Sequence, residues 1–476
     1  MLRRDQISLL PAVPLLLVAW LSAGPHEALA WSYPPESGKV HPQIVLYTLD
    51  GDRTLALSSL RGKKVLLVHF ASWSEESRKM VPVWYEKTKP FVAEGKLAVL
   101  GVAHEQYADR CKLFTRWKGI DWPILHDPLN IVPVESVPLV VAIDEYGVVR
   151  DVLADPGKLE KSFLGKTFEE PKTPPKNVSD KLPDPRNTRR TASDSRSAAG
   201  WRKHGDALIL AGRSPQINEA IDTYRRVLTM DNEDALAYFR LGVAYRIRDD
   251  RPERQNGDFQ AAITAWRKAV ELDAENQVFA ARLLQYGPRV DKPGSFYAWI
   301  EDAEKAMKQR GDSPVKLSVE PTTMELAQPG KKFVSESEPA AKEDPGDKAK
   351  PDGEKLVHVE QAVVRGMGEH GEGVAAVLVT FRPDAQKNIC WDAAGPLQLW
   401  ISKPKSGKLS REFVEYAAGP QSAVEGARTL CFEITLPKQG KEPPTIAAHA
   451  VYAVRAGQGG ERQLLRQDIQ IKLETQ

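Results

Sequence analysis

The segment from Val65 to Pro82 constrains the possible fold more than any other part of this chain. Residues 65–70 read Val-Leu-Leu-Val-His-Phe and predict a buried strand. A tight turn follows, and a helix is expected to begin near Ser74. Ser72 with Glu75 fits a capping box, and Ser74 is an alternative N-cap. A buried strand that leads directly into a helix is typical of an α/β fold.

Strands and helices alternate on both sides of this segment. Asp50-Gly51 and the Glu145-Tyr-Gly147 turn each separate two strand patterns and predict hairpins. We therefore predict an α/β domain over residues 31–170, in which a strand-helix-strand unit is followed by a terminal hairpin. The expected strands are residues 44–47, 54–56, 65–70, 97–102, 139–144 and 148–153, and the expected helices are residues 75–94 and 107–117, with a loop at His126.

The sequence from Trp73 to Pro82, at the junction of this strand and helix, resembles the thioredoxin superfamily. The nearest branch is the exported bacterial thiol-disulfide oxidoreductases and their redoxin-type, peroxiredoxin-like relatives. The motif of that family is Trp-Cys-x-x-Cys, whereas Ser74 and Ser77 stand at the two cysteine positions here. The resemblance also implies a cis proline at Pro138, facing the redox-motif turn. In active members the backbone beside this proline pairs with an extended substrate, so Val137 and Pro138 are expected to line a peptide-binding cleft.

The serines decide which chemistry is expected of this site. Dithiol exchange needs a thiolate, which a helix N-terminus stabilises, and a second sulfur that resolves the mixed disulfide. A serine hydroxyl has a far higher pKa and forms no disulfide. Glu75 and Glu76 suit the positive end of the helix dipole but would oppose a thiolate there. We therefore expect a redox-inactive site in which Trp73, Ser74 and Ser77 are vestigial motif positions.

Cys111 provides the alternative, an oxidoreductase or peroxidase that uses a single thiol. It lies on the expected helix 107–117 between Arg110 and Lys112, and neighbouring cations lower a thiol pKa. It does not lie at a strand-to-helix turn and has no cysteine near it in sequence. A structural or merely free thiol is the competing interpretation.

The length and net charge of the chain limit the number of domains and the kinds of partner that are expected. At 476 residues the chain is expected to hold two to four domains, and a formal net charge of +2 gives no field that favours nucleic acid. Residues 1–30 are typical of a signal peptide, with Arg3 and Arg4, an apolar run and an Ala28-Leu-Ala30 cleavage site. Export to the periplasm or the extracellular space is expected, with an uncleaved N-terminal anchor as the alternative, and with no membrane span after signal removal.

A polar linker and a helical repeat are expected after the α/β domain. Residues 171–200 are rich in Pro, Ser and charge, which predicts a solvated tether. Residues 201–312 resemble tetratricopeptide repeats, with small residues such as Gly205 and Gly242 where paired helices approach closely. Such repeats present a groove to a peptide or protein, although a purely structural spacer is the alternative. Residues 313–355 are expected to hold a strand at 318–320 and a charged linker.

The last part of the chain, residues 356–476, predicts an all-β sandwich from at least six apolar or alternating runs. The region from Cys390 to Trp400 and around Tyr452 resembles the immunoglobulin-like N-terminal domain of the transmembrane disulfide reductase system, although the cysteine pair of that family is absent. A generic sandwich is the alternative. Cys390 and Cys431 are expected either to form a disulfide or to remain apart, with Cys431 as a core residue.

Together these patterns predict an exported, redox-inactive scaffold that binds proteins or peptides through its thioredoxin cleft and its repeats. No metal is expected, because His69, His104 and His126 are scattered in sequence, and no cofactor is expected either. The oligomeric state is open. A carbohydrate or wall polymer is a third kind of ligand that the sandwich and repeats could bind, but aromatic residues are not concentrated there.

Overall fold

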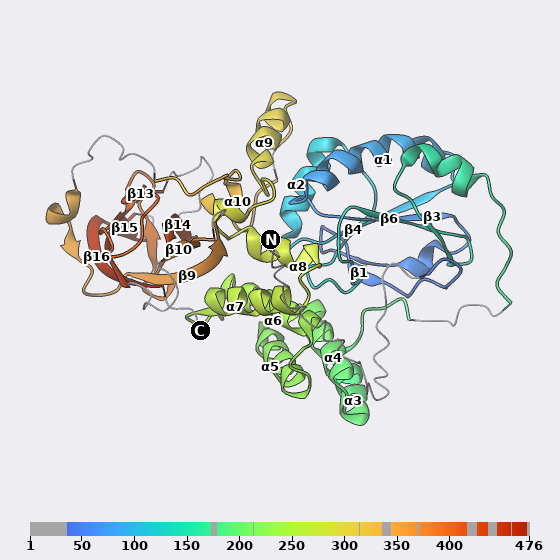
Figure 1. The fold of residues 1–476 in the computed structure, drawn as a ribbon, viewed down its shortest axis with the longest axis horizontal. Coiled ribbons are helices and arrows are strands. Elements are labelled where there is room, and N and C mark those ends of the chain that lie inside the picture. The colour runs from blue at the N-terminus through green and yellow to red at the C-terminus, as the bar shows by residue number, and fades with distance from the viewer. Residues whose placement is uncertain are drawn as a thin grey trace, which may run out of the picture. The chain divides into compact units, whose positions relative to one another are not determined.

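Strand β3 (Val65–Phe70) is the middle strand of a five-stranded sheet with the order β5-β4-β3-β6-β7. Figure 1 labels β3, β4 and β6 of this sheet. All six of its residues are buried. The strands β4 (Ala98–Ala103) and β5 (Ile124–His126) run parallel, whereas β6 (Leu139–Ile143) and β7 (Val149–Val152) complete the sheet in antiparallel pairs. The order of elements agrees with the α/β prediction.

The computed structural model describes residues 36–172, 179–212, 214–313, 315–335, 344–368, 371–416, 426–436, 445–457 and 459–473. The expected signal peptide at residues 1–30 lies outside this range. All described residues belong to one unit of the chain, Tyr33–Gln476. Among them, no helix is long and apolar enough to cross a membrane.

Two helices and a short hairpin accompany the sheet. Helix α1 (Glu75–Ala93) follows β3, and helix α2 (Ala108–Lys118) follows β4. The strands β1 (Val45–Tyr47) and β2 (Thr54–Ala56) form the expected antiparallel hairpin. One element differs from the prediction: residues 124–126, expected to lead into a loop at His126, pair with β4 as the edge strand β5.

A set of helices follows, and two of them, α3 (Pro185–Ser195) and α10 (Thr323–Leu326), were not predicted from the sequence. Helix α3 lies within the expected tether, where Asp184 caps it and Ala192 is buried. The side chains of Tyr224 and Trp266 leave no room for a Cβ atom at Gly205 and Gly242, so the expected close approach of paired helices is confirmed. The helices are α3 (Pro185–Ser195), α4 (Ala198–Ala211), α5 (Ser214–Met230), α6 (Ala235–Asp249), α7 (Asp258–Leu272), α8 (Gln277–Leu284), α9 (Trp299–Gln309) and α10 (Thr323–Leu326).

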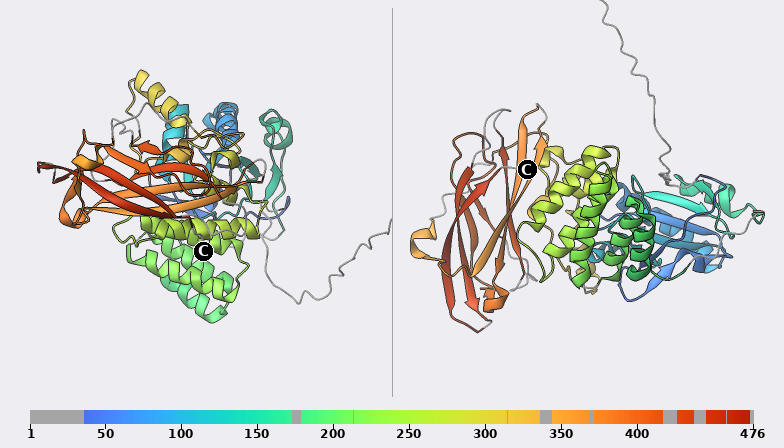
Figure 2. Two further views of the ribbon diagram at one scale, coloured as in Figure 1. Left: turned by 60° about the vertical axis from the view of Figure 1, so that its left-hand side comes forward. Right: turned by 90° about the horizontal axis from the view of Figure 1, so that it is seen from below.

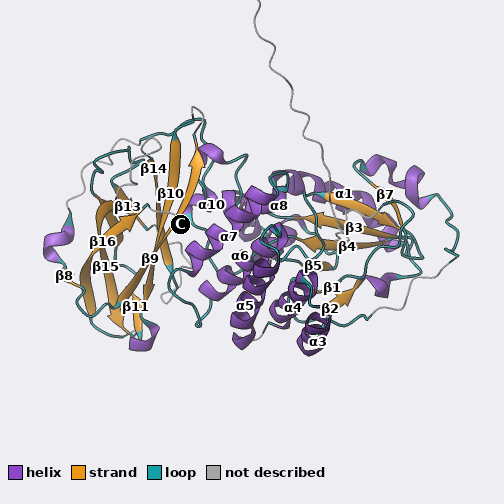
Figure 3. Cartoon of the chain, turned by 60° about the horizontal axis from the view of Figure 1, so that its bottom comes forward, coloured by secondary structure: helices purple, strands orange, loops and turns teal. Residues whose placement is uncertain are grey.

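The C-terminal strands form two sheets that share one apolar core (Figure 3). Val377 and Phe432 of the smaller sheet pack with Leu399 and Tyr452 of the larger one. The smaller sheet consists of β9 (Val357–Met367), β10 (Gly373–Pro383) and β14 (Arg428–Thr435). The larger consists of β8 (Lys350–Pro351), β11 (Ile389–Trp391), β12 (Leu397–Ile401), β13 (Phe413–Glu415), β15 (Thr445–Ala456) and β16 (Arg462–Lys472).

The helices pack on both the α/β part and the smaller sheet (Figure 2). On the sheet side, the Gln260 side chain of α7 accepts a hydrogen bond from the backbone N–H of Val363 in β9 at 2.8 Å.

Residues 318–320, expected to form a strand, form none; instead Arg110 of α2 donates to the carbonyl of Val319 at 3.3 Å. Short 3-10 or π turns occur at Leu57–Leu60, Pro156–Lys158, Glu160–Leu164, Arg289–Asp291, Pro345–Lys348 and Ala385–Lys387.

Candidate functional site

Helix α1 begins at a serine where the family motif has its first cysteine. Ser74 is the N-cap residue, with φ −82° and ψ 119°, and its hydroxyl accepts a hydrogen bond from the N–H of Ser77 at 3.1 Å. The alternative N-cap of the sequence prediction is therefore the correct one. The capping box at Ser72 is wrong, because Ser72 lies two residues before the N-cap and its hydroxyl donates to Glu105 instead.

The structure brings the expected cleft residues together. The Val137–Pro138 peptide bond is cis, as the resemblance implied, and the Ser74 hydroxyl donates to the Val137 carbonyl at 3.3 Å. Trp73 is half-buried, and its indole N–H donates to the carbonyl of His104 at 2.9 Å. Ser77 is fully buried. The Ser74 hydroxyl thus caps helix α1 and is hydrogen-bonded to the residue before the cis proline.

Cys111 lies apart from this turn, inside the apolar cluster that also contains Phe70 and Phe114. Its side chain is fully buried, and burial raises the pKa of the thiol well above its ordinary value, with the Glu105 carboxyl as a smaller cause. The expectation that neighbouring cations lower this pKa is wrong. Arg110 is itself buried and is paired with Glu325 at 2.6 Å.

Cys390 and Cys431 are both buried and free, so the expected alternative of a disulfide is wrong. The neighbours of Cys390 in β11 and of Cys431 in β14 point into the core between the two sheets, and the cysteines therefore point away from it. Cys431 faces the helices, where burial raises its pKa to about 11. Packed sheets lie about 10 Å apart, which is too far for sulfurs on opposite outer faces to bond.

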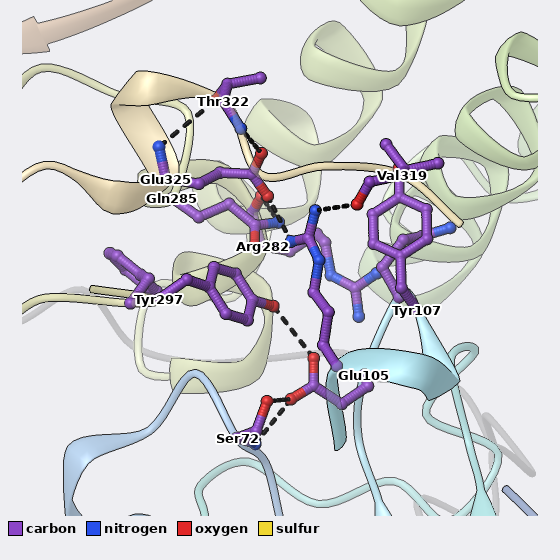
Figure 4. A network of polar contacts seen from close by, with 12 residues as sticks. Ser72, Glu105, Tyr107, Arg282, Gln285, Tyr297, Val319, Thr322 and Glu325 are labelled. Carbon is purple, nitrogen blue, oxygen red and sulfur yellow. Dashed lines mark hydrogen bonds and ion pairs between the residues drawn. The ribbon is translucent and has the colours of Figure 1, made fainter. Parts of the chain in front are cut away.

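Glu105, a residue that was not predicted from the sequence, binds the turn at Ser72. This fully buried carboxyl accepts hydrogen bonds from the N–H of Ser72 at 2.6 Å, from the Ser72 hydroxyl and from the Tyr297 hydroxyl at 3.0 Å (Figure 4). Burial raises its pKa, and the hydrogen bonds oppose that shift. Glu105 thereby ties the turn from Ser72 to Ser74, called the serine turn below, to Tyr297, almost two hundred positions further along the chain. A polar residue after an apolar strand was the only signal for it in the sequence.

Two histidines that are far apart in sequence are in direct contact behind the turn. His69 Nδ1 and His104 Nε2 lie 3.1 Å apart, and both rings are buried. Burial lowers the pKa of His104 to about 3 and that of His69 well below its ordinary value, so both are neutral at pH 7. These two residues, scattered in sequence, are therefore brought together by the fold. Within the described ranges, no group of three or more His, Cys, Asp or Glu side chains could hold a metal ion.

The loop before the cis proline is also in contact with helices of the same chain. The carbonyl of Glu135 accepts hydrogen bonds from the N–H groups of Gln277 and Val278, at the start of α8. Arg240 of α6 donates to the carbonyls of Leu129 and Asn130 at 3.0 and 2.9 Å. The loop before the cis proline is thus bound by two helices.

A mixed sheet whose central strand leads into α1, with a cis proline opposite the start of that helix, defines a thioredoxin-like domain. The chain is 31% identical over 123 residues to the thioredoxin-like protein YneN of Bacillus subtilis (strain 168), a match that spans 25% of this chain and 71% of that protein. The chain therefore belongs to the thioredoxin-like proteins. No family model matches it.

Solved structures of thiol-disulfide proteins are similar to about a quarter of the chain. The thioredoxin domain of a thiol-disulfide oxidoreductase from Bacteroides vulgatus is 18% identical and covers 26% of this chain and 96% of its own, with a TM-score of 0.25. A thiol:disulfide interchange protein of the thioredoxin family from Chlorobium tepidum is 21% identical, with coverages of 25% and 88% and a TM-score of 0.23.

Proposed function

We propose that this protein is an exported thioredoxin-like scaffold that holds protein segments and does not exchange disulfides. The observation that carries the proposal is the Ser74 hydroxyl, which occupies the place of the motif's first thiol and is engaged both by the Ser77 N–H and by the Val137 carbonyl. An oxygen at this position keeps the hydrogen bonds of the cap. It supplies neither the thiolate nor the second sulfur that exchange requires.

The serine site could be bypassed only if another thiol took over its role. Cys111 is fully buried and its pKa is raised, so at neutral pH it remains a protonated thiol out of contact with solvent. This argues against the alternative of a single-thiol oxidoreductase or peroxidase that uses Cys111.

The remaining parts of the chain fit a role in holding protein segments. The helix pairs α4–α5 and α6–α7 pack closely at Gly205 and Gly242, which supports the assignment of tetratricopeptide-type repeats. The two C-terminal sheets support an immunoglobulin-like or generic sandwich. Repeats of this kind present an extended surface that can hold a peptide or protein. The signal-peptide pattern of residues 1–30 supports export to the periplasm or the extracellular space, with an uncleaved anchor as the alternative.

Reduction of insulin disulfides by dithiothreitol tests the proposal. We expect the wild-type protein to leave the rate at that of buffer, while a thioredoxin with an intact dithiol motif accelerates it. Cys111→Ser is the matched variant, and it should behave as wild type. A clear acceleration by the wild-type chain would overturn the proposal, and its loss in Cys111→Ser would assign the activity to that thiol.

A further inference from the structure

The N–H groups at the start of α8 find their acceptor in the loop before the cis proline. The first N–H groups of a helix have no partner within the helix and must be satisfied from outside. In α8 the N–H of Gln277 donates to the Glu135 carbonyl at 2.7 Å, and that of Val278 donates to the same oxygen at 3.3 Å. Glu135 lies two residues before Val137, so the chain itself holds the segment that leads into the backbone on which the resemblance implied an extended substrate.

A second segment closes the opposite side of the serine turn. Arg78 of α1 donates to the Ser72 carbonyl at 2.7 Å and to the carbonyls of Phe296 and Ser295 at 3.2 and 3.1 Å. The next residue, Tyr297, donates to Glu105, which lies between Tyr297 and Ser72 (Figure 4). One guanidinium thus binds the turn to the segment that follows α8.

Apolar packing fills the space between these two contacts. Trp73 packs against both apolar clusters of this region, one of which contains Val137 and Phe279 and the other Phe296. Only 9% of Ser74 is exposed, although it lies at the tip of a helix. Val83, on the same helix, is 51% exposed.

We propose that residues 276–298 form an intramolecular cap that occupies the thioredoxin-like cleft, so that the ligand of the cleft in this state is the chain's own α8 and the segment after it. This inference rests on the proposed function, in which the cleft holds protein segments. A partner peptide reaches Ser74 and Pro138 only when the cap releases Glu135 and Arg78.

Alkylation of a cysteine introduced at position 74 measures this closure. The variants Ser74→Cys and Val83→Cys are treated with iodoacetamide under native conditions, and modification at each position is followed by peptide mass spectrometry. We expect position 74 to react far more slowly than position 83, after both rates are divided by those in urea.

A second substitution tests whether slow alkylation at position 74 comes from the cap or from burial by the rest of the fold. Proline is well accepted at the first position of a helix, and Asn276, with φ −77° and ψ 98°, has the extended backbone that a following proline requires. Gln277→Pro therefore keeps α8 but removes the shorter of the two hydrogen bonds to the Glu135 carbonyl, whereas Gln277→Ala keeps both. In the Ser74→Cys background, Gln277→Pro should raise the alkylation rate about tenfold, as expected for the loss of one hydrogen bond from a closed state. Gln277→Ala should leave the rate unchanged.

Two outcomes would overturn the cap. One is a native rate at position 74 equal to that at position 83. The other is a slow rate that Gln277→Pro does not change while circular dichroism shows the variant folded. Neither outcome bears on the insulin assay, so failure of the cap and failure of the redox-inactive scaffold are told apart.

Discussion

Ser74 places a hydroxyl where the family motif has a thiol, and the start of a helix acts differently on these two groups. The positive end of the helix dipole converts a thiol into a reactive thiolate, whereas a serine hydroxyl stays protonated at neutral pH. It therefore donates to Val137 while it accepts from Ser77. This role could be predicted from sequence, because an N-cap depends on residues within one helical turn.

Glu105 could not be predicted in the same way. Its hydrogen-bond donors, Ser72 and Tyr297, are separated from it by 33 and 192 positions. Only the folded chain brings them to one carboxyl. The same holds for Cys111, whose neighbours in sequence are cations but whose surroundings in the fold are apolar.

A single buried histidine, His41, should make the free energy of unfolding depend on pH. Burial lowers the pKa of His41 from 6.5 to about 4, so between these values the unfolded chain binds a proton that the folded chain does not. The stability that neutral His41 allows is present above about pH 6.5 and is lost as the pH falls toward 4. His41→Gln should remove this dependence. Urea unfolding should show wild type losing roughly 2 kcal/mol relative to His41→Gln between pH 7 and 5.

A difference between wild type and His41→Gln that stays constant over this pH range would contradict the assignment. The comparison of two chains cancels the contributions of other titrating groups, such as Asp127, whose pKa burial raises to about 6.

At the scale of elements, strong periodic patterns were predicted well and weakly patterned ones were not. The strand Val65–Phe70 has the predicted bounds, because six consecutive strand-forming residues leave little choice. The strand β5 has only three residues and is a strand only because β4 lies beside it. Helix α3 carries a single buried residue, Ala192, and therefore shows no apolar period; packing on α4 and the Asp184 cap support it.

The close approach of α6 and α7 gives a prediction for one glycine. In Gly242→Ala the new Cβ atom would overlap the indole ring of Trp266. The cost of overpacking should exceed the gain in helix propensity and lower the free energy of unfolding by about 1–3 kcal/mol. A double-mutant cycle with Trp266→Phe, which shortens the ring, should show that much of the cost is coupled to Trp266. Additive effects in the cycle would mean that the two helices do not meet at this point.

At the scale of the whole described chain, the sequence predicted domains joined by tethers, whereas arginines bind the parts to one another. Arg382 of β10 donates to both carboxyl oxygens of Asp249 in α6, each at 2.9 Å. Arg246 of the same helix also binds Asp249, and it donates to the Tyr107 hydroxyl of the thioredoxin-like part at 2.8 Å. Such contacts join residues more than one hundred positions apart, so no local pattern indicates them.

Removal of Arg382 should therefore affect the stability of the whole chain. Arg382→Ala leaves Asp249 buried with one cation fewer, and we expect a loss of about 2–4 kcal/mol in the free energy of unfolding. Lys268→Ala is the control, because Lys268 pairs with Glu271 on an exposed surface of α7 and should change stability by less than about 0.5 kcal/mol. Differential scanning calorimetry should show one transition in wild type. If wild type instead shows separate transitions and Arg382→Ala leaves them unchanged, then Arg382 does not join the parts of the chain.

The absence of exchangeable thiols in the native chain is tested most directly by intact mass. The protein is equilibrated with oxidised glutathione under native conditions and quenched with acid, and its intact mass is measured by mass spectrometry. A urea-unfolded sample is the positive control. Because Cys111, Cys390 and Cys431 are free but buried, we expect the native mass to be unchanged and the unfolded sample to carry glutathione. A glutathione adduct or the loss of two hydrogens in the native sample would contradict the account of a thioredoxin-like site without redox chemistry.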